Sequence, residues 1–463
     1  MSSKFPTQWK NAHVVPIFKK GEPTDVKNYR PISLLSTFSK LFESLVCPVL
    51  TSLIKTQLAT QQHGFCTNKS TTTNLVHYIN DISRSVDSGV QVDSIYTDFS
   101  SAFDKVNHVL LLQKLENYGM HGHLLRWFES YLSERQQRVI IKGYQSPLYY
   151  STSGVPQGSH LGPILFLVFV NDIIYSIKNS KCSMFADDLK LYREIESSTD
   201  IALLQKDLDA IHEWCLSNKM TLNAVKCYHI TFTRKKLIQP SAYHLNGITL
   251  RKVDTIRDLG VQLDSQLSFI NHFDTVVAKA NKMSGFVKRT CKEFRSVGTL
   301  KILYNSLVRS ILEYASPVWN PAYRVHIDRI ECIQKKFTRY LRYRSQTCDR
   351  EADYPQRLCH FKMSSLEQRR SCSDLIFLYK TLHNLANVPE LVSEISLDVP
   401  RRTLYRSNFK TKTFQMPKNR TNLGRSAPLY RFLSSYNKLS TRTNSLDIFS
   451  NSLNEFRRYV LSS

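Results

Sequence analysis

Apolar residues follow two different spacings along the chain, and the change from one to the other divides it. Up to about residue 270, short apolar runs typical of strands stand between stretches with apolar residues at helical spacing. VVPIFKKG (14–21) predicts a strand that ends in a basic turn. Residues 28–54 begin with a proline-marked start and then predict a helix. The apolar residues at helical spacing there are Phe38, Leu41, Phe42, Leu45 and Val49.

Residues 91–270 combine strand and helix signals. Residues 92–107 start as a strand and then become helical around Ser101. KCSMFADDLKLYREI predicts a hairpin folded at two adjacent aspartates, Asp187 and Asp188. Three helices are expected, over 123–134, 161–177 and 199–220, and the middle one is apolar enough to be buried.

After about residue 270 the strand signal fades and helices are predicted. Ile330, Ile333, Phe337 and Leu341 share one helical face. The exposed positions of that helix carry Lys335, Lys336, Arg339, Arg342 and Arg344. Residues 401–463 hold thirteen Lys or Arg against two acidic residues, so this tail is either a nucleic-acid-binding extension or a poorly ordered end.

Composition narrows the class of protein. At 463 residues the chain is too long for one ordinary domain, and 42% hydrophobic residues indicate real cores. A net charge of +25 favours a polyanionic partner. Ten cysteines without CxxC or zinc-finger spacing predict reduced thiols of an intracellular protein, in the nucleus, the cytoplasm or both. The N-terminus lacks a signal-peptide pattern and ILFLVFV (164–170) is too short to span a bilayer, so no membrane partner is expected.

The two adjacent aspartates raise a chemical question, because like charges repel and burying carboxylates is costly. Divalent cations would neutralise them. Mg²⁺ suits such a site because it takes few carboxylates and completes its shell with water and substrate phosphates. Phosphoryl transfer on nucleic acid often uses two such ions roughly 3.5–4 Å apart. A further carboxylate from another strand is needed, and Asp98 in SIYTDFSSAFD ends an apolar strand.

Eight motifs in order carry a family resemblance over residues from about 8 to 345. They are WKNAHVVPIFKKG, NYRPISLLS, QHGF, YTDFSSAFDKVNH, SGVPQGSHLGPILF, MFADD, RDLGVQLD and SILEYASPVWNP. With these motifs the chain resembles the reverse transcriptases of non-LTR (LINE-type, Jockey-like) retrotransposons. The resemblance implies an α+β right-hand polymerase: fingers and palm in 1–270 with an antiparallel sheet and packed helices, then a helical thumb in 271–345. A basic C-terminal region of unknown fold, 346–463, follows.

The resemblance also implies roles for the acidic and aromatic residues. Asp98 and Asp187 would hold two Mg²⁺ ions, with Mn²⁺ as a substitute. Asp188 would help to bind metal or shape the site, and the backbone carbonyl of Phe99 would complete one metal shell. Phe103 would sit under the sugar and leave no room for a 2′-hydroxyl.

Further roles concern the nucleotide and the nucleic acid. In GVPQG, Gly154 and Gly158 flank the rigid Pro156 and would allow close approach to nucleotide and template. Gln157 would hydrogen-bond near the incoming base or sugar. Arg30, Lys69 and Lys226 are candidate nucleotide contacts, with a solvated surface cation as the alternative for each. Lys335, Lys336 and Arg339 would track the nucleic-acid backbone.

The predicted reaction is RNA-templated DNA synthesis, in which a primer 3′-hydroxyl attacks the α-phosphate of a dNTP. Two departures from the family support an alternative, a catalytically inactive, element-derived RNA-binding protein. Cys66 stands where the family usually has an arginine, and the chain lacks the N-terminal endonuclease expected of full elements. A two-metal nuclease is a weaker option, because it would not need Phe103 or GVPQG. The oligomeric state and the RNA that is copied are left open.

Overall fold

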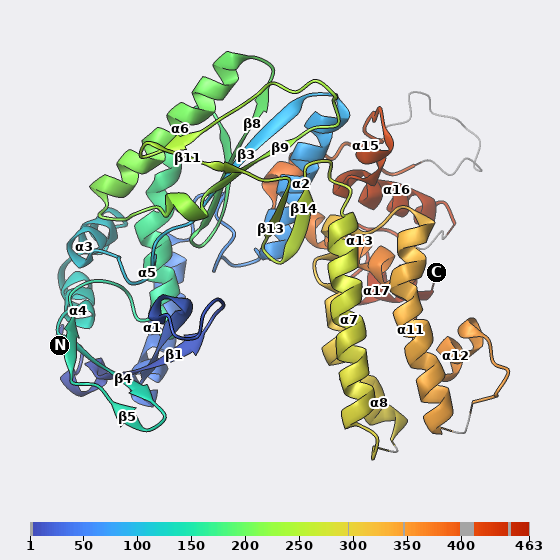
Figure 1. Ribbon diagram of the computed structural model, residues 1–463, viewed down its shortest axis with the longest axis horizontal. Helices are drawn as coiled ribbons and strands as arrows, with labels where there is room; N and C mark the ends of the chain where they lie inside the picture. The colour runs from blue at the N-terminus through green and yellow to red at the C-terminus, as the bar shows by residue number, and fades with distance from the viewer. Residues whose placement is uncertain (1–2, 295, 346–347, 399–411, 443–445, 463) are drawn as a thin grey trace. The chain divides into compact units, whose positions relative to one another are not determined.

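The computed structural model describes residues 3–294, 296–345, 348–398, 412–442 and 446–462 (Figure 1). Its contacts divide the chain into two compact units. The first unit comprises Met1–Cys66, Ser94–His229 and Pro240–Lys252, and the second comprises Thr67–Asp93, Ile230–Gln239 and Val253–Ser463. Helices and antiparallel sheets occur in the same chain, which confirms the predicted α+β class. The division into fingers, palm and thumb stays a prediction.

Two sheets form the framework around the candidate site. One is ordered β2-β1-β4-β5, with β6 also paired to β4, and the other is ordered β12-β9-β3-β8-β7. The strands of the first sheet are β1 (Ala12–Phe18), β2 (Tyr29–Leu35), β4 (Arg135–Ile141), β5 (Tyr144–Gln145) and β6 (Tyr149–Ser151). Those of the second are β3 (Gln91–Thr97), β7 (Lys181–Phe185), β8 (Asp188–Ile195), β9 (Tyr228–Phe232) and β12 (Arg251–Lys252). A small hairpin of β10 (His244–Leu245) and β11 (Ile248–Thr249) follows β9.

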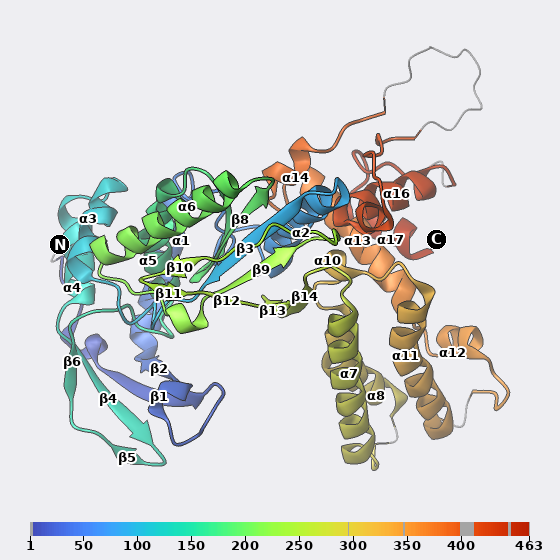
Figure 2. The same cartoon turned by 45° about the horizontal axis from the view of Figure 1, so that its top comes forward.

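Helices of the first unit share a hydrophobic core with β3, β7 and β8 of the second sheet, and α6 runs alongside β8 (Figure 2). They are α1 (Thr37–Ile54), α3 (His108–Asn117), α4 (Gly122–Leu132), α5 (Leu161–Val170) and α6 (Ser198–Ser217). Helix α5 is almost wholly buried, as its unbroken apolar sequence predicted. A 3₁₀ segment, Asn171–Ser176, continues it, so the helix predicted over 161–177 is confirmed in two parts.

The apolar residues that predicted helix α1 do not mark its buried face. The helix forms, but strand β2 precedes it, and the apolar residues that predicted it lie largely in solvent. Phe38, Leu41 and Leu45 are 68%, 60% and 66% exposed, whereas Glu43 is fully buried. The carboxylate of Glu43 accepts hydrogen bonds from the backbone N–H groups of His160 (2.8 Å) and Leu161 (3.3 Å). Those N–H groups stand at the start of α5, so a buried charge anchors this helix to its neighbour.

Helix α1 is also long and apolar enough to cross a membrane by length and composition alone. Only 22% of its apolar window is buried in the fold. The carboxylate of Glu43 nevertheless ties α1 into the first unit, because it also accepts from the hydroxyl of Tyr131 on α4 at 3.2 Å.

The second unit is mostly helical, as the fading strand signal predicted. Its elements before residue 346 are α2 (Thr71–Asp87), β13 (Thr255–Asp258), β14 (Val261–Asp264), α7 (Ile270–Thr290), α8 (Val297–Tyr304), a π-helical segment (Asn305–Arg309), α9 (Ser310–Glu313), α10 (Ser316–Trp319) and α11 (Arg324–Ser345). The region of unknown predicted fold contributes α12 (Tyr354–His360), α13 (Leu366–Leu382), α14 (Pro389–Ser393), α15 (Asn422–Ser426), α16 (Pro428–Ser440) and α17 (Leu453–Ser462). Parts of the predicted basic tail, 399–411 and 443–445, lie outside the described residues.

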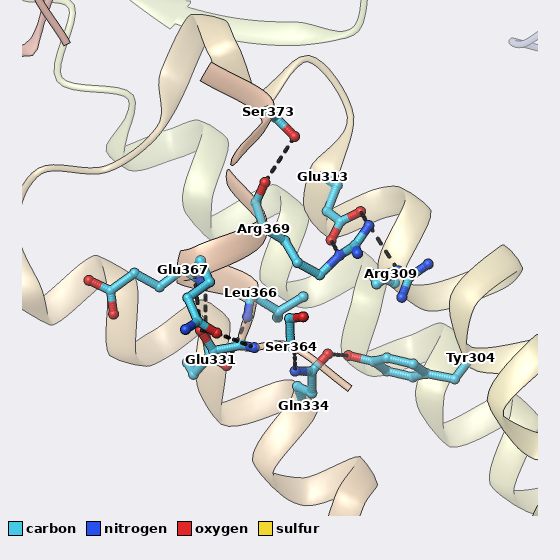
Figure 3. Close-up of polar contacts among 12 residues, drawn as sticks. Tyr304, Arg309, Glu313, Glu331, Gln334, Ser364, Leu366, Glu367, Arg369 and Ser373 are labelled. Carbon is cyan, nitrogen blue, oxygen red and sulfur yellow. Dashed lines mark hydrogen bonds and ion pairs between the residues drawn. The ribbon is translucent and has the colours of Figure 1, made fainter. Parts of the chain in front are cut away.

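A polar network joins α11 to its neighbours inside the second unit (Figure 3). The buried carboxylate of Glu331 accepts from the N–H groups of Leu366 (3.0 Å) and Glu367 (3.1 Å), and so caps the start of α13. Gln334, one turn further along α11, accepts from the Tyr304 hydroxyl at 3.2 Å. These side chains are buried and paired, so they orient the helices while the predicted apolar face of α11 supplies the core.

Candidate active site

The predicted hairpin at the aspartates is confirmed, with its tip one residue earlier than the aspartate pair. Phe185 of β7 pairs with Asp188 of β8, which leaves Ala186 and Asp187 as the two turn residues. Ala186 has φ 56°, a left-handed conformation that costs energy for any residue with a Cβ. The side chain of Asp187 is part-buried, whereas Asp188 is exposed at the first position of β8. The two aspartates therefore occupy different environments.

Asp98 directly follows β3 and is held by the segment that precedes β9. Its carbonyl accepts from the N–H of Asn223 at 2.8 Å, and its own N–H donates to the Sγ atom of Cys227 at 3.4 Å. The N–H of Ser100 donates to the carbonyl of Thr221 at 2.9 Å. Phe99 lies in sequence between Asp98 and Ser100, and its carbonyl takes no part in these hydrogen bonds. That oxygen is therefore a reasonable ligand for a cation, as the resemblance implies.

The carboxylates of Asp98 and Asp187 interact. Burial raises the pKa of Asp187, and the negative charge of Asp98 raises it further, while Lys19 and Arg30 act in the opposite direction. The two acids, 89 positions apart in sequence, thus share one electrostatic environment. Among the described residues, no three His, Cys, Asp or Glu side chains form a group that could hold a metal ion by themselves. A pair of carboxylates with one free carbonyl fits Mg²⁺, which takes its remaining ligands from water and phosphate.

Phe103 lies in a turn that precedes α3, not in the helix predicted to start near residue 101. The chain from Ser100 to Lys105 forms turns, and α3 begins at His108. The ring of Phe103 stacks on that of Phe166 with centroids 4.5 Å apart and planes 15° apart. Helix α5 therefore supports one face of the ring and limits its movement.

The GVPQG loop is bonded to this same turn. The N–H of Gly154 donates to the carbonyl of Val106 at 2.8 Å, and the N–H of Val155 donates to that of Phe103 at 2.9 Å. Gly154 has φ 87°, and a Cβ there would lie 2.7 Å from the carbonyl oxygen of Asp104. Only glycine therefore fits, and the loop and the Phe103 turn form one unit.

Gln157 and Gly158 complete the loop. The Nε2 of Gln157 donates to the carboxylate of Asp104 at 2.9 Å, and its backbone carbonyl accepts from the N–H of Ser33 at 2.7 Å. A Cβ on Gly158 would lie 2.7 Å from the carbonyl oxygen of Ser33. Pro156, between Gly154 and Gly158 in the sequence, is buried. Both glycines lie close to neighbouring backbone, whereas their approach to nucleotide and template stays a prediction.

Comparison with known proteins decides the family. A family model described as reverse transcriptase (RNA-dependent DNA polymerase) matches residues 17–263, more than half of the chain. The chain belongs to this family. The matched residues include Asp98, Phe103, the GVPQG loop and both aspartates of the hairpin.

Curated relatives come from non-LTR mobile elements, as the resemblance predicted. The RNA-directed DNA polymerase from mobile element jockey of Drosophila melanogaster is 30% identical over 350 residues, which cover 72% of this chain and 38% of that protein. The probable RNA-directed DNA polymerase from transposon X-element of the same organism is 28% identical, covering 73% of this chain and 38% of that protein. The chain spans less than half the length of these curated relatives. Among solved structures, apo telomerase from Candida Tropicalis has a TM-score of 0.45 at 12% identity, covering 99% of this chain and 70% of that chain, a likeness too weak to support an argument.

The remaining predicted site residues of the chain lie in several places. Arg30, on β2, carries a positive charge that opposes the burial-driven rise in the pKa of Asp187. Lys226 is exposed at the end of a 3₁₀ turn, Ala224–Lys226, in the segment that holds Asp98. Lys69 belongs to the second unit, just before α2. Cys66, which ends the first unit, is half-buried.

The predicted nucleic-acid contacts on α11 belong to the second unit. Lys336 and Arg339 are exposed, and the Nζ of Lys335 lies 5.5 Å from the ring centroid of Tyr354. Lys336 lies near Lys288 of α7, since its charge adds to burial in lowering the pKa of Lys288. Helices α7 and α11 of the second unit thus place positive charges near each other.

A groove in the second unit adds candidates that residue patterns did not indicate. The β13–β14 hairpin, which is the RDLGVQLD motif, lines it together with α7 and Tyr314. Arg257 and Lys279 contribute positive charge there, and both act with burial to lower the pKa of His272 to about 4. The motif with Arg257 was visible in the sequence. The groove forms only where α7, which carries Lys279 and lies farther along the chain, packs beside it.

Two further polar side chains, Asp104 and Gln62, have no sequence signal beyond their places in YTDFSSAFDKVNH and QHGF. Asp104 accepts from Gln157, and Gln62 accepts from the backbone of the aspartate turn. Their importance follows from contacts between segments that are 53 and 124 positions apart.

Proposed function

We propose that this chain is an RNA-directed DNA polymerase that joins a dNTP to a primer 3′-hydroxyl by two-metal nucleotidyl transfer. The observation that carries the proposal is that one compact unit holds Asp98 at the end of β3, the aspartate hairpin, and the Phe103 turn bonded to the GVPQG loop. The charge of Asp98 acts on the pKa of Asp187, which agrees with this arrangement. Family membership supports it, as do relatives named RNA-directed DNA polymerase.

The acidic residues have defined tasks in this proposal. Asp98, Asp187 and the carbonyl of Phe99 would hold the metal ions, with Mn²⁺ able to replace Mg²⁺, and Asp188 would bind metal or shape the site. Bound ions would lower the pKa of the primer hydroxyl and neutralise charge on the leaving pyrophosphate. The positive charges of Lys19 and Arg30 already act on the Asp187 carboxylate, and both side chains are suited to bind triphosphate oxygens.

Phe103 and Gln157 would select the nucleotide. Stacking on Phe166 keeps the Phe103 ring from yielding to a 2′-hydroxyl, which supports a preference for deoxynucleotides. Gln157 donates one N–H to Asp104, so its Oε1 and second N–H are left to face a ligand. Lys69 and Lys226 stay candidates for phosphate contacts.

The second unit would hold the template and primer. Lys288, Lys335, Lys336 and Arg339 supply charge without an evident sequence-reading geometry, so an RNA–DNA hybrid would be bound through its backbone and shape. The fingers, palm and thumb division over 1–270 and 271–345, a nucleic-acid role for 346–463, and an intracellular location are parts of the same proposal.

Primer extension on an RNA template, with dNTPs and Mg²⁺, tests the function. Extension by the wild type that disappears in Asp187→Ala, and persists in a control, Asp209→Ala on the exposed face of α6, is the expected result. Cys66 favours one alternative, an inactive RNA-binding protein, because a thiol cannot grip a triphosphate as arginine does. Tight, salt-sensitive RNA binding without extension in either Mg²⁺ or Mn²⁺ would overturn the polymerase proposal in favour of that alternative.

A further inference from the structure

The turn that carries Asp187 is anchored from outside the hairpin. Gln62 is 1% exposed, and its Oε1 accepts from the N–H of Ala186 at 3.0 Å and from the N–H of Gly64 at 2.8 Å. Ala186 is the residue with φ 56°, and it immediately precedes Asp187. One side-chain oxygen, 124 positions earlier in sequence, therefore bonds the strained peptide of this turn.

Backbone bonds bring Gln62 to this place. The N–H of His63 donates to the carbonyl of Met184, and the N–H of Met184 donates to the carbonyl of Gln61, both at 2.9 Å. These bonds form a parallel bridge between Gln62 and Met184, along β7. At Ala186 the chain turns away from β7, and the Gln62 side chain supplies the acceptor for the N–H of Ala186.

Gly64 allows the contact. A Cβ at this position would lie 2.3 Å from the backbone nitrogen of Ala186, closer than any real carbon can approach. The φ of Gly64 is not in the left-handed region, so close approach is the reason for glycine here. The Q-H-G sequence thus combines an acceptor for the turn with a residue small enough to stand against it.

Fixing the Ala186 peptide determines where Asp187 points. A left-handed non-glycine residue costs about 1–3 kcal/mol and persists only where its surroundings hold it. If the Ala186 N–H lost its acceptor, the turn could relax to another type and the Asp187 carboxylate would move away from Asp98. Side chains that orient a metal ligand commonly affect metal affinity by 10- to 100-fold.

We propose that Gln62 is a positioning residue that holds the Ala186–Asp187 turn so that the Asp187 carboxylate meets Asp98 at the metal-binding site. The inference rests on the proposed two-metal function. It goes beyond that function because it assigns the geometry of the acidic pair to a side chain outside both carboxylate-bearing segments. The competing interpretation is that Gln62 only stabilises the loop from 59 to 66, in which case metal affinity would not depend on it separately from folding.

Mn²⁺ binding tests this without requiring activity. Free Mn²⁺ would be titrated by electron paramagnetic resonance with the full chain, and binding lost in Asp187→Ala defines the site. Gln62→Ala is expected to weaken that binding about 10-fold or more, by analogy with other residues that orient metal ligands. Gln61→Ala is the matched control, since its side chain meets only Thr60 in the described contacts and its bond to Met184 is made by the backbone. Gln61→Ala is expected to bind as the wild type does.

Stability measurements separate positioning from folding. The thermal midpoint of Gln62→Ala is recorded beside its Mn²⁺ affinity, and a folded variant with wild-type affinity overturns the inference. If Gln62→Ala does not fold, Gln62→Glu decides, because its carboxyl oxygen still accepts from both N–H groups. A folded Gln62→Glu that binds Mn²⁺ supports the inference, and one as weak as Asp187→Ala overturns it. If the wild type shows neither Asp187-dependent Mn²⁺ binding nor primer extension, the proposed function has failed; if it shows both and Gln62→Ala equals Gln61→Ala, only this inference has failed.

Discussion

Gly154→Ala tests whether the GVPQG loop and the Phe103 turn act as one unit. The substitution has two costs. An alanine at φ 87° costs about 1–2 kcal/mol relative to glycine. Its Cβ would also lie 2.7–2.9 Å from three backbone atoms of Asp104, so one segment must move. That movement would weaken the two backbone bonds from Gly154 and Val155, at about 0.5–1.5 kcal/mol each.

Gly143→Ala separates these costs. Gly143 has nearly the same φ, 88°, but no atom lies within 4 Å of where its Cβ would be. Gly143→Ala should therefore lose only about 1–2 kcal/mol. Gly154→Ala should lose about 1–3 kcal/mol more, because the two bonds from the loop are also weakened.

Thermal unfolding and primer extension measure the two consequences. The extra loss should lower the melting temperature of Gly154→Ala below that of Gly143→Ala by about 2–4 °C for each kcal/mol. Extension should fall up to about 100-fold in Gly154→Ala, because Phe103 and Gln157 move by up to roughly 1 Å, and should be unchanged in Gly143→Ala. Equal melting temperatures and equal extension rates for the two variants would refute the reasoning that backbone contact couples the loop to the turn.

Three other predictions use the buried ionisable groups. Burial and the charge of Asp98 raise the pKa of Asp187, so its ionised form opposes folding at neutral pH. Asp187→Asn should therefore raise the melting temperature of the metal-free protein while abolishing extension. Mn²⁺ binding by the wild type should be lost on acidification at a higher pH than for an ordinary aspartate. Glu43→Ala leaves buried donors at the start of α5 unpaired and should lower the free energy of unfolding by about 2–4 kcal/mol in urea titrations, whereas Glu129→Ala, on the exposed side of α4, should change it by less than about 0.5 kcal/mol. The pKa of His272 is lowered to about 4, so between about pH 6.5 and 4 the unfolded chain binds a proton there that the folded protein does not. As the pH falls through that window, the free energy of unfolding should decrease by up to about 3 kcal/mol. His272→Phe should show a shallower decrease, and parallel curves for the two proteins would contradict this assignment.

Patterns along the chain predicted elements best where one face of an element meets a single core. Helix α11 buries the four apolar residues that marked it, and α5 is buried as its unbroken apolar run indicated. The pattern was less informative for α1, because Glu43 on its other face bonds to the start of α5. Periodicity reports which residues are apolar, but the neighbouring elements decide which face is covered.

Local sequence by itself predicted most of the helices and strands, though not the turn from Ser100 to Lys105, and it predicted the hairpin at the aspartates. It also indicated the family, because turn chemistry, apolar spacing and each motif are properties of short stretches of the chain. Tertiary structure alone decided that the charge of Asp98 acts on the pKa of Asp187, that Gly154 stands against Asp104, and that Gln62 bonds to Ala186. Each of these depends on segments between 50 and 124 positions apart that meet within a few ångströms. Such contacts arise from packing of whole elements, and no local pattern of residues encodes them.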